Sequence, residues 1–93
     1  MSFTRNSAAQ LAKSDLAGRL NVDVTTITQR SISDEDFPDM SLGAGEKGET
    51  SAQMISSGWR ISLGVKGKTY EYRADKYQLR LRNFDGENHV IES

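Results

Sequence analysis

The sequence predicts an α+β domain in which one N-terminal helix packs on an antiparallel sheet of four to five strands. Two observations indicate this fold class. Residues 8–20 carry leucines and alanines at helical spacing. The chain after residue 23 is rich in β-branched and aromatic residues, in short runs separated by turn residues. A helix followed by such a meander is expected to cover one face of the sheet.

The helix is expected from Ala8 to Leu20, with the Ser7 side chain as its N-terminal cap. Its apolar face is narrow, so the helix should lie on the sheet rather than inside the core. The leucines of this face are Leu11, Leu16 and Leu20. Asn21 suits the C-terminal end of the helix.

The first strand is expected at residues 24–32, and an acidic stretch at residues 33–36 should follow it. The other strands are expected at residues 53–63, 68–74, 77–84 and 89–91. A tight turn at residues 64–67 makes a hairpin of the second and third strands. Gly58 indicates a bulge or a close approach of another backbone.

Residues 77–84 alternate in polarity, which predicts one apolar and one solvated face. The apolar face holds Tyr77, Leu79 and Leu81, and the solvated face holds Gln78, Arg80 and Arg82. Tyrosines and basic residues in this region, including Arg73 and Lys76, would suit a stacking platform for single-stranded nucleic acid. Because strand periodicity separates the two types, a solvated face with Glu71 and Arg73 in cross-strand charge pairs is favoured.

The composition bounds the class of protein. The 93 residues are expected to form a single domain, with residues 1–6 as a flexible lead-in. A net charge of −1 gives no bulk attraction to nucleic acid or to an anionic membrane. The chain has no cysteine, which excludes disulfides, thiolate metal sites and cysteine nucleophiles. No apolar run resembles a membrane span or a signal peptide, so a cytoplasmic location is expected.

The long connection at residues 37–48, FPDMSLGAGEKG, contains the only proline and a Gly-x-Gly-x-x-Gly pattern at Gly43, Gly45 and Gly48. A dinucleotide fingerprint requires a hydrophobic strand before the glycines and a helix that starts within them. Here a proline-containing turn precedes the glycines, and residues 56–58 interrupt any following helix. We therefore expect the glycines to occupy backbone positions with positive φ and expect no cofactor.

Other polar side chains give no catalytic or metal site. The carboxylates around the loop lack the spacing of a calcium loop, and we expect them to be solvated. They are Asp34, Glu35, Asp36, Asp39, Glu46 and Glu49. His89, the only histidine, is expected to be a surface strand residue, and no Gly-x-Ser-x-Gly elbow accompanies it. The chain is therefore not expected to be an enzyme.

Four segments together resemble a family of short, mostly uncharacterised bacterial domains, including cyanobacterial ones. The segments are DLAGRLNV (residues 15–22), FPDMSLGAG (37–45), QMISSGWRISL (53–63) and GKTYEYRAD (67–75). The family pattern has a [WF]-P-D-x-S-L-G loop motif, then G-[YW]-R-I-x-L, then Y-E-Y. The resemblance supports the α+β fold and implies no known activity. Its loop signature falls on Pro38, Asp39, Ser41, Leu42 and Gly43.

The chain departs from this family where relatives carry reactive residues. The family's Cys-Pro in the loop is Ala44-Gly45 here, and its His-Thr after Y-E-Y is Arg73-Ala74. No role of that cysteine or histidine is therefore carried over.

A weaker similarity connects residues 69–92 with potato inhibitor I-type serine protease inhibitors. It implies an exposed reactive segment near Tyr70 and Arg73, with the scissile bond between Tyr70 and Glu71. The same residues also fit the second arm of a hairpin.

The first functional hypothesis is a non-catalytic protein-interaction or accessory module that uses the loop of residues 38–48, since ordered loops often hold function. Its expected partner is another protein, with no nucleic acid and no membrane span. The candidate contact residues are Phe37, Pro38, Asp39, Ser41, Leu42, Gly43 and Trp59. The alternative is a serine protease inhibitor, and an enzyme using the loop carboxylates with His89 comes third.

Overall fold

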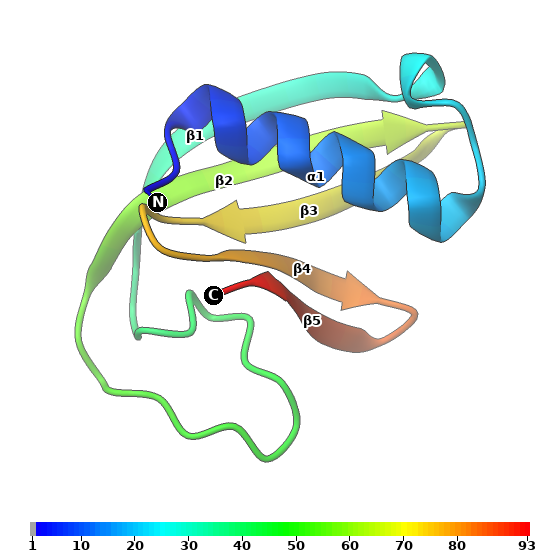
Figure 1. The fold of residues 1–93 in the computed structure, drawn as a ribbon. Helices are drawn as coiled ribbons and strands as arrows, with labels where there is room; N and C mark the ends of the chain where they lie inside the picture. Colours follow the sequence, from blue (N-terminus) through cyan, green and yellow to red (C-terminus); the bar gives the residue numbers. More distant parts are fainter. Residues whose placement is uncertain (1) are drawn as a thin grey trace.

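The structure is a computed structural model that describes residues 2–93. Five strands form one antiparallel sheet in the order β1-β2-β3-β4-β5, and the helix α1 lies along one face of it (Figure 1). The expected fold class, one N-terminal helix on an antiparallel sheet, is confirmed. The elements are α1 (Arg5–Leu20), a 3₁₀ turn (Val24–Thr26), β1 (Thr28–Phe37), β2 (Ser56–Val65), β3 (Lys68–Ala74), β4 (Leu79–Phe84) and β5 (Glu87–Glu92).

The helix begins three residues earlier than predicted, and its cap is Thr4 rather than Ser7. The two side chains form a reciprocal capping box. The Ser7 amide donates to Thr4 Oγ1 at 3.1 Å, and the Thr4 amide donates to Ser7 Oγ at 2.8 Å. The helix ends as expected at Asn21, whose left-handed φ of 54° closes it.

The hydrophobic core fills the space between α1 and the sheet. Alanines form much of the helix side, so that the helix backbone approaches the strands closely. Of the three predicted leucines, Leu16 is fully buried, and Leu11 and Leu20 lie at the core's margin. Each fully buried leucine or isoleucine contributes about 1.5–3 kcal/mol relative to an exposed one. The fully buried core residues are Ala8, Ala12, Leu16, Ile61, Leu63, Tyr72, Ala74, Leu79 and Leu81.

A polar contact in the middle of the sheet helps to fix the helix to it. The Tyr72 hydroxyl on β3 donates to Asp15 Oδ2 on α1 at 2.7 Å, and Arg19 Nε donates to the same oxygen at 2.8 Å. Burial, together with this carboxylate, raises the pKa of Tyr72 well above its ordinary value. The phenol therefore stays protonated and acts as a donor at any physiological pH.

The first strand differs from its prediction at both ends. Residues 24–26 form a 3₁₀ turn instead, because Asp23 Oδ1 accepts the Thr25 amide at 2.9 Å. The acidic stretch at residues 33–36 lies within β1, where Asp34 pairs with Trp59 and Asp36 with Ser57. Strand β1 is at the edge of the sheet, and edge strands tolerate charge.

Gly58 confirms the predicted close backbone approach. A Cβ at this position would collide with the carbonyl oxygen of Ala74 on β3. The positive-φ prediction for the loop glycines is confirmed at Gly43 (65°) and Gly48 (84°), but Gly45 has no positive φ.

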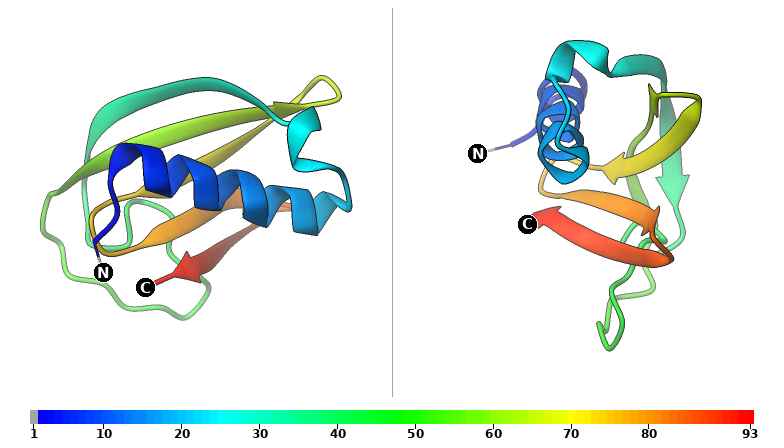
Figure 2. Two further views of the ribbon diagram at one scale, coloured as in Figure 1. Left: turned by 45° about the horizontal axis from the view of Figure 1, so that its top comes forward. Right: turned by 90° about the vertical axis from the view of Figure 1, so that its right-hand side faces the viewer.

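The predicted alternation of residues 77–84 is only half correct. Leu79 and Leu81 are buried beneath the helix, as expected. Tyr77 precedes β4 and is exposed, whereas Gln78 and Arg80 are buried rather than solvated. The reason is the long connection between β1 and β2, which lies away from the helix and covers part of the other face of the sheet (Figure 2).

Candidate functional site

The connection between β1 and β2, residues 38–55, is the candidate site and is called the β1–β2 loop below. It passes beneath β4 and β5 in Figure 1. Side chains from three strands and the adjoining turn fasten it to the sheet, and each of them is 31 to 43 positions away in the sequence from its partner in the loop. One backbone amide of β5 adds a bond to a loop side chain 44 positions away.

The strongest of these contacts joins Arg80 on β4 to Glu49 in the loop. The guanidinium makes a bidentate pair, with Nη1–Oε1 at 2.6 Å and Nη2–Oε2 at 2.7 Å. Its Nε donates to Gln78 Oε1 at 2.7 Å, and only 5% of Arg80 is exposed. Hydrogen bonding by Arg80 lowers the pKa of Glu49 to about 2. The expectation of a solvated Arg80 is wrong because the loop supplies this carboxylate.

Backbone atoms of the loop are held as well. Arg73 Nη1 donates to the Leu42 carbonyl at 2.8 Å, and Gln78 Nε2 donates to the Met40 carbonyl at 2.7 Å. Near the far edge of the sheet, Asn88 Nδ2 donates to the Gly45 carbonyl at 2.8 Å. These bonds satisfy carbonyl groups that an irregular segment leaves without ladder partners.

The loop's first turn is built by Asp39. Its Oδ1 accepts from the Ser41 amide at 3.0 Å, the Gly43 amide at 3.0 Å and the Ser41 hydroxyl at 2.8 Å. These bonds hold the pKa of Asp39 below its usual value, and the bond from the Gly43 amide has the largest effect. The turn places Leu42, with its positive φ of 60°, in a fully buried position.

The predicted contact residues therefore differ in how accessible they are to a partner. The side chains of Phe37, Ser41 and Leu42 are buried, so they hold the loop against the sheet and are not accessible to a partner. The Arg73 guanidinium lies 5.3 Å from the centre of the Phe37 ring. Pro38 is exposed, and Asp39 and Gly43 are half-buried.

Trp59 is not part of the same surface. It is half-buried and packs against the core on the helix side of β2. Its neighbour Arg60 points to the other face, where it meets Glu35 at 3.5 Å and Glu71 at 3.6 Å. Successive side chains of a strand point to opposite faces, so Trp59 and the buried loop residues lie on opposite sides of the sheet.

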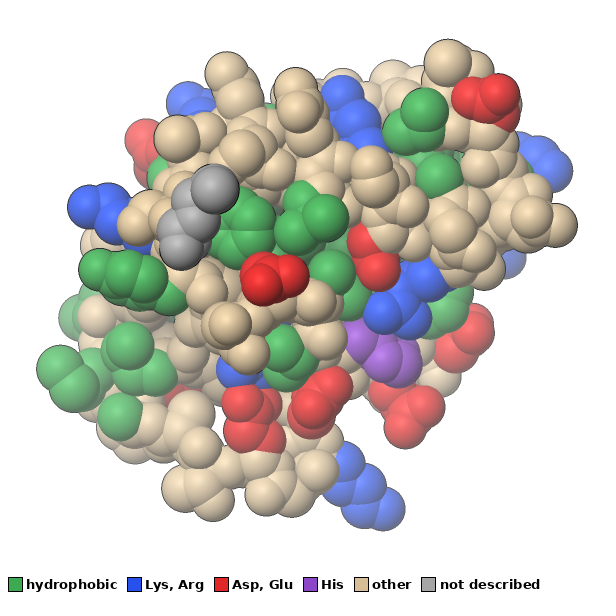
Figure 3. All heavy atoms as spheres, in the orientation of Figure 1, with side chains coloured by type: hydrophobic (Ala, Val, Ile, Leu, Met, Phe, Trp, Pro, Cys, Tyr) green, Lys and Arg blue, Asp and Glu red, His purple; other side chains and the backbone are tan. Residues whose placement is uncertain are grey.

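The sequence analysis missed an exposed apolar surface that the two ends of the loop form together with Tyr77. Its four large side chains are exposed by 38% to 75% and line one open hollow of about 400 Å³, called the apolar hollow below. They are Met40, Met54, Ile55 and Tyr77. Hydrophobic side chains gather at the lower left of Figure 3, the end where β2 begins in Figure 1. Among residues 2–93, Val24 is the one other large hydrophobic residue exposed in this way.

A signal for this surface is present in the sequence. Met54 and Ile55 are adjacent, so they cannot both point into the core from one strand. The strand expected at residues 53–63 includes both of them, but β2 begins only at Ser56.

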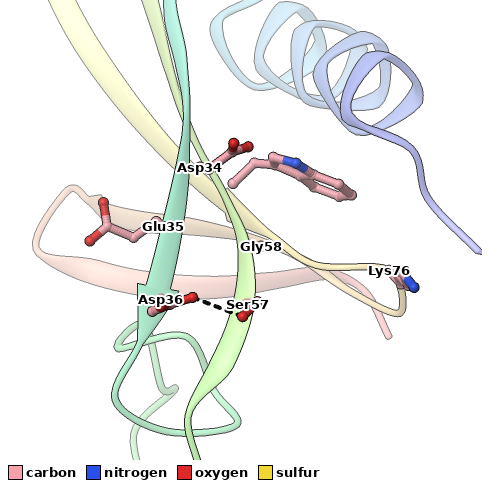
Figure 4. A pocket seen from close by; sticks show the side chains of 7 residues that line it. Asp34, Glu35, Asp36, Ser57, Gly58 and Lys76 are labelled. Atoms are coloured by element: carbon pink, nitrogen blue, oxygen red, sulfur yellow. Dashed lines mark hydrogen bonds between the residues drawn. The ribbon is translucent and has the colours of Figure 1, made fainter.

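A second hollow of about 260 Å³ adjoins the first and shares Ser57 and Lys76 with it. It is called the acidic hollow, because Asp34, Glu35 and Asp36 on β1 contribute to its lining (Figure 4). Ser57 Oγ donates to Asp36 Oδ1 at 2.8 Å, and Asp34 and Glu35 point to opposite sides of β1.

The remaining polar candidates have structural contacts. His89 is half-buried, with its ring edge-on to Phe84 at 6.0 Å between centres. Glu46 accepts the Val90 amide at 2.9 Å. Across residues 2–93, no three His, Asp or Glu side chains are grouped so as to hold a metal ion. No helix in this part of the chain has the length and apolar content needed to cross a membrane.

The segment proposed for protease inhibition lies in β3, the central strand. Tyr70 pairs with Leu63 of β2, and Glu71 pairs with both Ser62 of β2 and Arg82 of β4. Tyr72 is fully buried. The segment therefore lacks the exposed, unpaired backbone on which an inhibitor of this type depends.

The fold and the site define a small α+β domain in which a helix covers one face of a β-meander and an ordered loop covers part of the other. The chain belongs to the family described as Domain of unknown function (DUF8738), whose model matches residues 9–82. No curated protein and no solved structure matches the chain. The matched range contains all four segments on which the resemblance to an uncharacterised domain family rested.

Proposed function

We propose that this domain is a non-catalytic protein-interaction module whose contact surface is the apolar hollow. The observation that supports it is the clustering of exposed large hydrophobic side chains, four of which line this one hollow. Contiguous exposed apolar surface of this kind typically marks a place where another protein binds. Methionine and tyrosine are also enriched in protein interfaces.

The surface is built on a fixed frame, which favours binding because little order must be gained on association. The Met40 amide donates to the Ala52 carbonyl at 3.0 Å, which joins the two ends of the β1–β2 loop. Asp75 is buried and accepts from the Ser56 hydroxyl at 3.0 Å and from the Tyr77 amide at 2.8 Å. These bonds tie the ends of the loop, the start of β2 and the turn after β3 together around the apolar hollow.

A matched pair of variants tests the proposal. Wild type, Ile55→Ser and Val24→Ser would be immobilised and exposed to lysate of the source cells, and captured proteins compared by quantitative mass spectrometry. We expect Ile55→Ser to lose a specific set of proteins that wild type and Val24→Ser both retain. Both substitutions replace an exposed aliphatic side chain, so neither should disturb folding. Equal capture by all three proteins would contradict the proposal.

A further inference from the structure

We infer that the partner binds as an extended segment along β1, with basic side chains at the acidic hollow and one large apolar side chain in the apolar hollow. This inference rests on the proposed function and adds the chemistry of the partner. It combines three features of one end of the molecule: an edge strand, a concentration of carboxylates on it, and the adjoining apolar surface.

The first feature is the edge itself. Strand β1 pairs with β2 alone, so one side of its backbone has no strand beside it. At Ile32 the carbonyl accepts from Arg5 Nη2 at 2.6 Å, so a side chain occupies the edge there. Beyond this point, residues 33–37 continue in regular register with β2. An extended peptide can add to such an edge through main-chain hydrogen bonds.

The second feature is charge. Asp34, Glu35 and Asp36 line the acidic hollow together with one cation, Lys76. Because Glu35 pairs with Arg60 at 3.5 Å, Asp34 and Asp36 leave the hollow with one more negative charge than Lys76 balances. Within residues 2–93, no Lys or Arg side chain forms an ion pair with Asp34 or Asp36. Charge complementarity therefore favours a segment that carries Lys or Arg. A second copy of this chain would bring the same carboxylates on its own β1 and is a poorer complement.

The third feature is continuity. The acidic and apolar hollows share Ser57 and Lys76, so one segment lying along β1 reaches both. Side chains of an extended peptide alternate in direction, so every second residue can face the carboxylates. The apolar hollow, at the end where β1 finishes and β2 begins, then receives the large side chain at one end of the segment.

Synthetic peptides test the inference directly. The probe is a fluorescent peptide of about eight residues, as long as a typical strand, with alternating lysines and a terminal Phe-Leu pair. It would be made in both sequence directions. Two control peptides replace the lysines by glutamate or the Phe-Leu pair by alanines. Binding would be measured by fluorescence anisotropy, and its place on the domain by amide hydrogen exchange.

We expect one direction of the peptide to bind and both control peptides to bind more weakly. The double variant Asp34→Asn with Asp36→Asn should weaken binding about fivefold, since exposed charge pairs each contribute little. The double variant Asp85→Asn with Glu87→Gln removes the same two charges around the β4–β5 turn and should have no effect. Among residues 33–37, the amides that face away from β2 should become protected on binding, and added salt should weaken the binding.

Several results would overturn the inference: no binding in either direction, binding unaffected by the Asp34 and Asp36 changes, protection away from β1, or self-association of the domain through β1. The proposed function is judged separately by the Ile55→Ser capture. If that capture is lost while the peptides fail to bind, the interaction surface stands and the basic extended partner does not. If capture is independent of Ile55, both fail.

Discussion

Replacing Glu49 with glutamine should destabilise the domain by about 1–2 kcal/mol at neutral pH. The change keeps the size of the side chain and removes the negative charge opposite Arg80. The guanidinium is then left largely buried, with Gln78 and the loop as its remaining neutral partners. A buried charge that loses its counterion costs more than the loss of a solvent-exposed pair.

The magnitude follows from how the pair is placed. Breaking a fully buried ion pair from one side costs about 3–5 kcal/mol, whereas an exposed pair contributes about 0–1 kcal/mol. The Arg80 side chain is 6% exposed, but that of Glu49 is 27% exposed, so the pair lies between these limits. Glutamine also keeps one oxygen that can accept from the guanidinium. We therefore expect a value below the buried limit.

The effect should depend on pH in a defined direction. The pKa of Glu49 falls from 4.5 to about 2 on folding, so its contribution is fully present above about pH 4.5. It is lost as the pH falls toward 2, because both folded and unfolded chains then bind the proton. The difference in unfolding free energy between wild type and Glu49→Gln should therefore be smaller at pH 3 than at pH 7.

Urea unfolding followed by Trp59 fluorescence measures both quantities. Glu87→Gln, at the exposed start of β5, serves as a control that removes a carboxylate with no ion pair within residues 2–93. A loss below about 0.5 kcal/mol at pH 7, the range of ordinary surface changes, would refute the assigned role of the pair. An equal deficit at pH 3 and pH 7 would refute the electrostatic origin of the effect.

Further substitutions test the backbone and the loop. Gly58→Ala should lower the melting temperature sharply, because the new Cβ meets the carbonyl oxygen of Ala74 on the neighbouring strand. Gly18→Ala places its Cβ in open space on the helix and should stabilise the domain by about 0.5–1 kcal/mol. A mild effect at Gly58 would contradict the close approach. Asp39→Ala should speed amide exchange at Ser41 and Gly43 while exchange in the core stays slow. Unchanged exchange at those two amides would show that Asp39 does not hold the turn.

The arrangement of helix and strands was predictable because local patterns determine it. Strand β3 runs from Lys68 to Ala74, as its β-branched and aromatic residues indicate, and the turn before it contains the expected glycine. The close approach at Gly58 was predictable because a glycine within a strand pattern usually marks a bulge or a neighbouring backbone. These features depend on neighbours within a few residues in the sequence.

The covered face of the sheet was not predictable in the same way. Alternating arginines in β4 have the pattern of a solvated face, and nothing in that pattern reveals a carboxylate 31 positions earlier. The acidic residues 33–36 were expected to follow the first strand, but they lie within β1, an edge strand in which charge is tolerated. The apolar hollow combines Met40 and the Met54–Ile55 pair, from opposite ends of the β1–β2 loop, with Tyr77 from the connection between β3 and β4, and only the fold brings them together.

The length of the β1–β2 loop also has a consequence for the order of folding. Strands β2 and β3 meet across a short turn, where Val65 pairs with Lys68, whereas Phe37 of β1 pairs with Ser56 across the whole loop. Closing a long loop costs chain entropy before its contacts compensate. Strands β2 to β5 are therefore expected to assemble first, and β1 to join last. The strand that we infer to bind the partner is then the one whose own pairing is slowest to form.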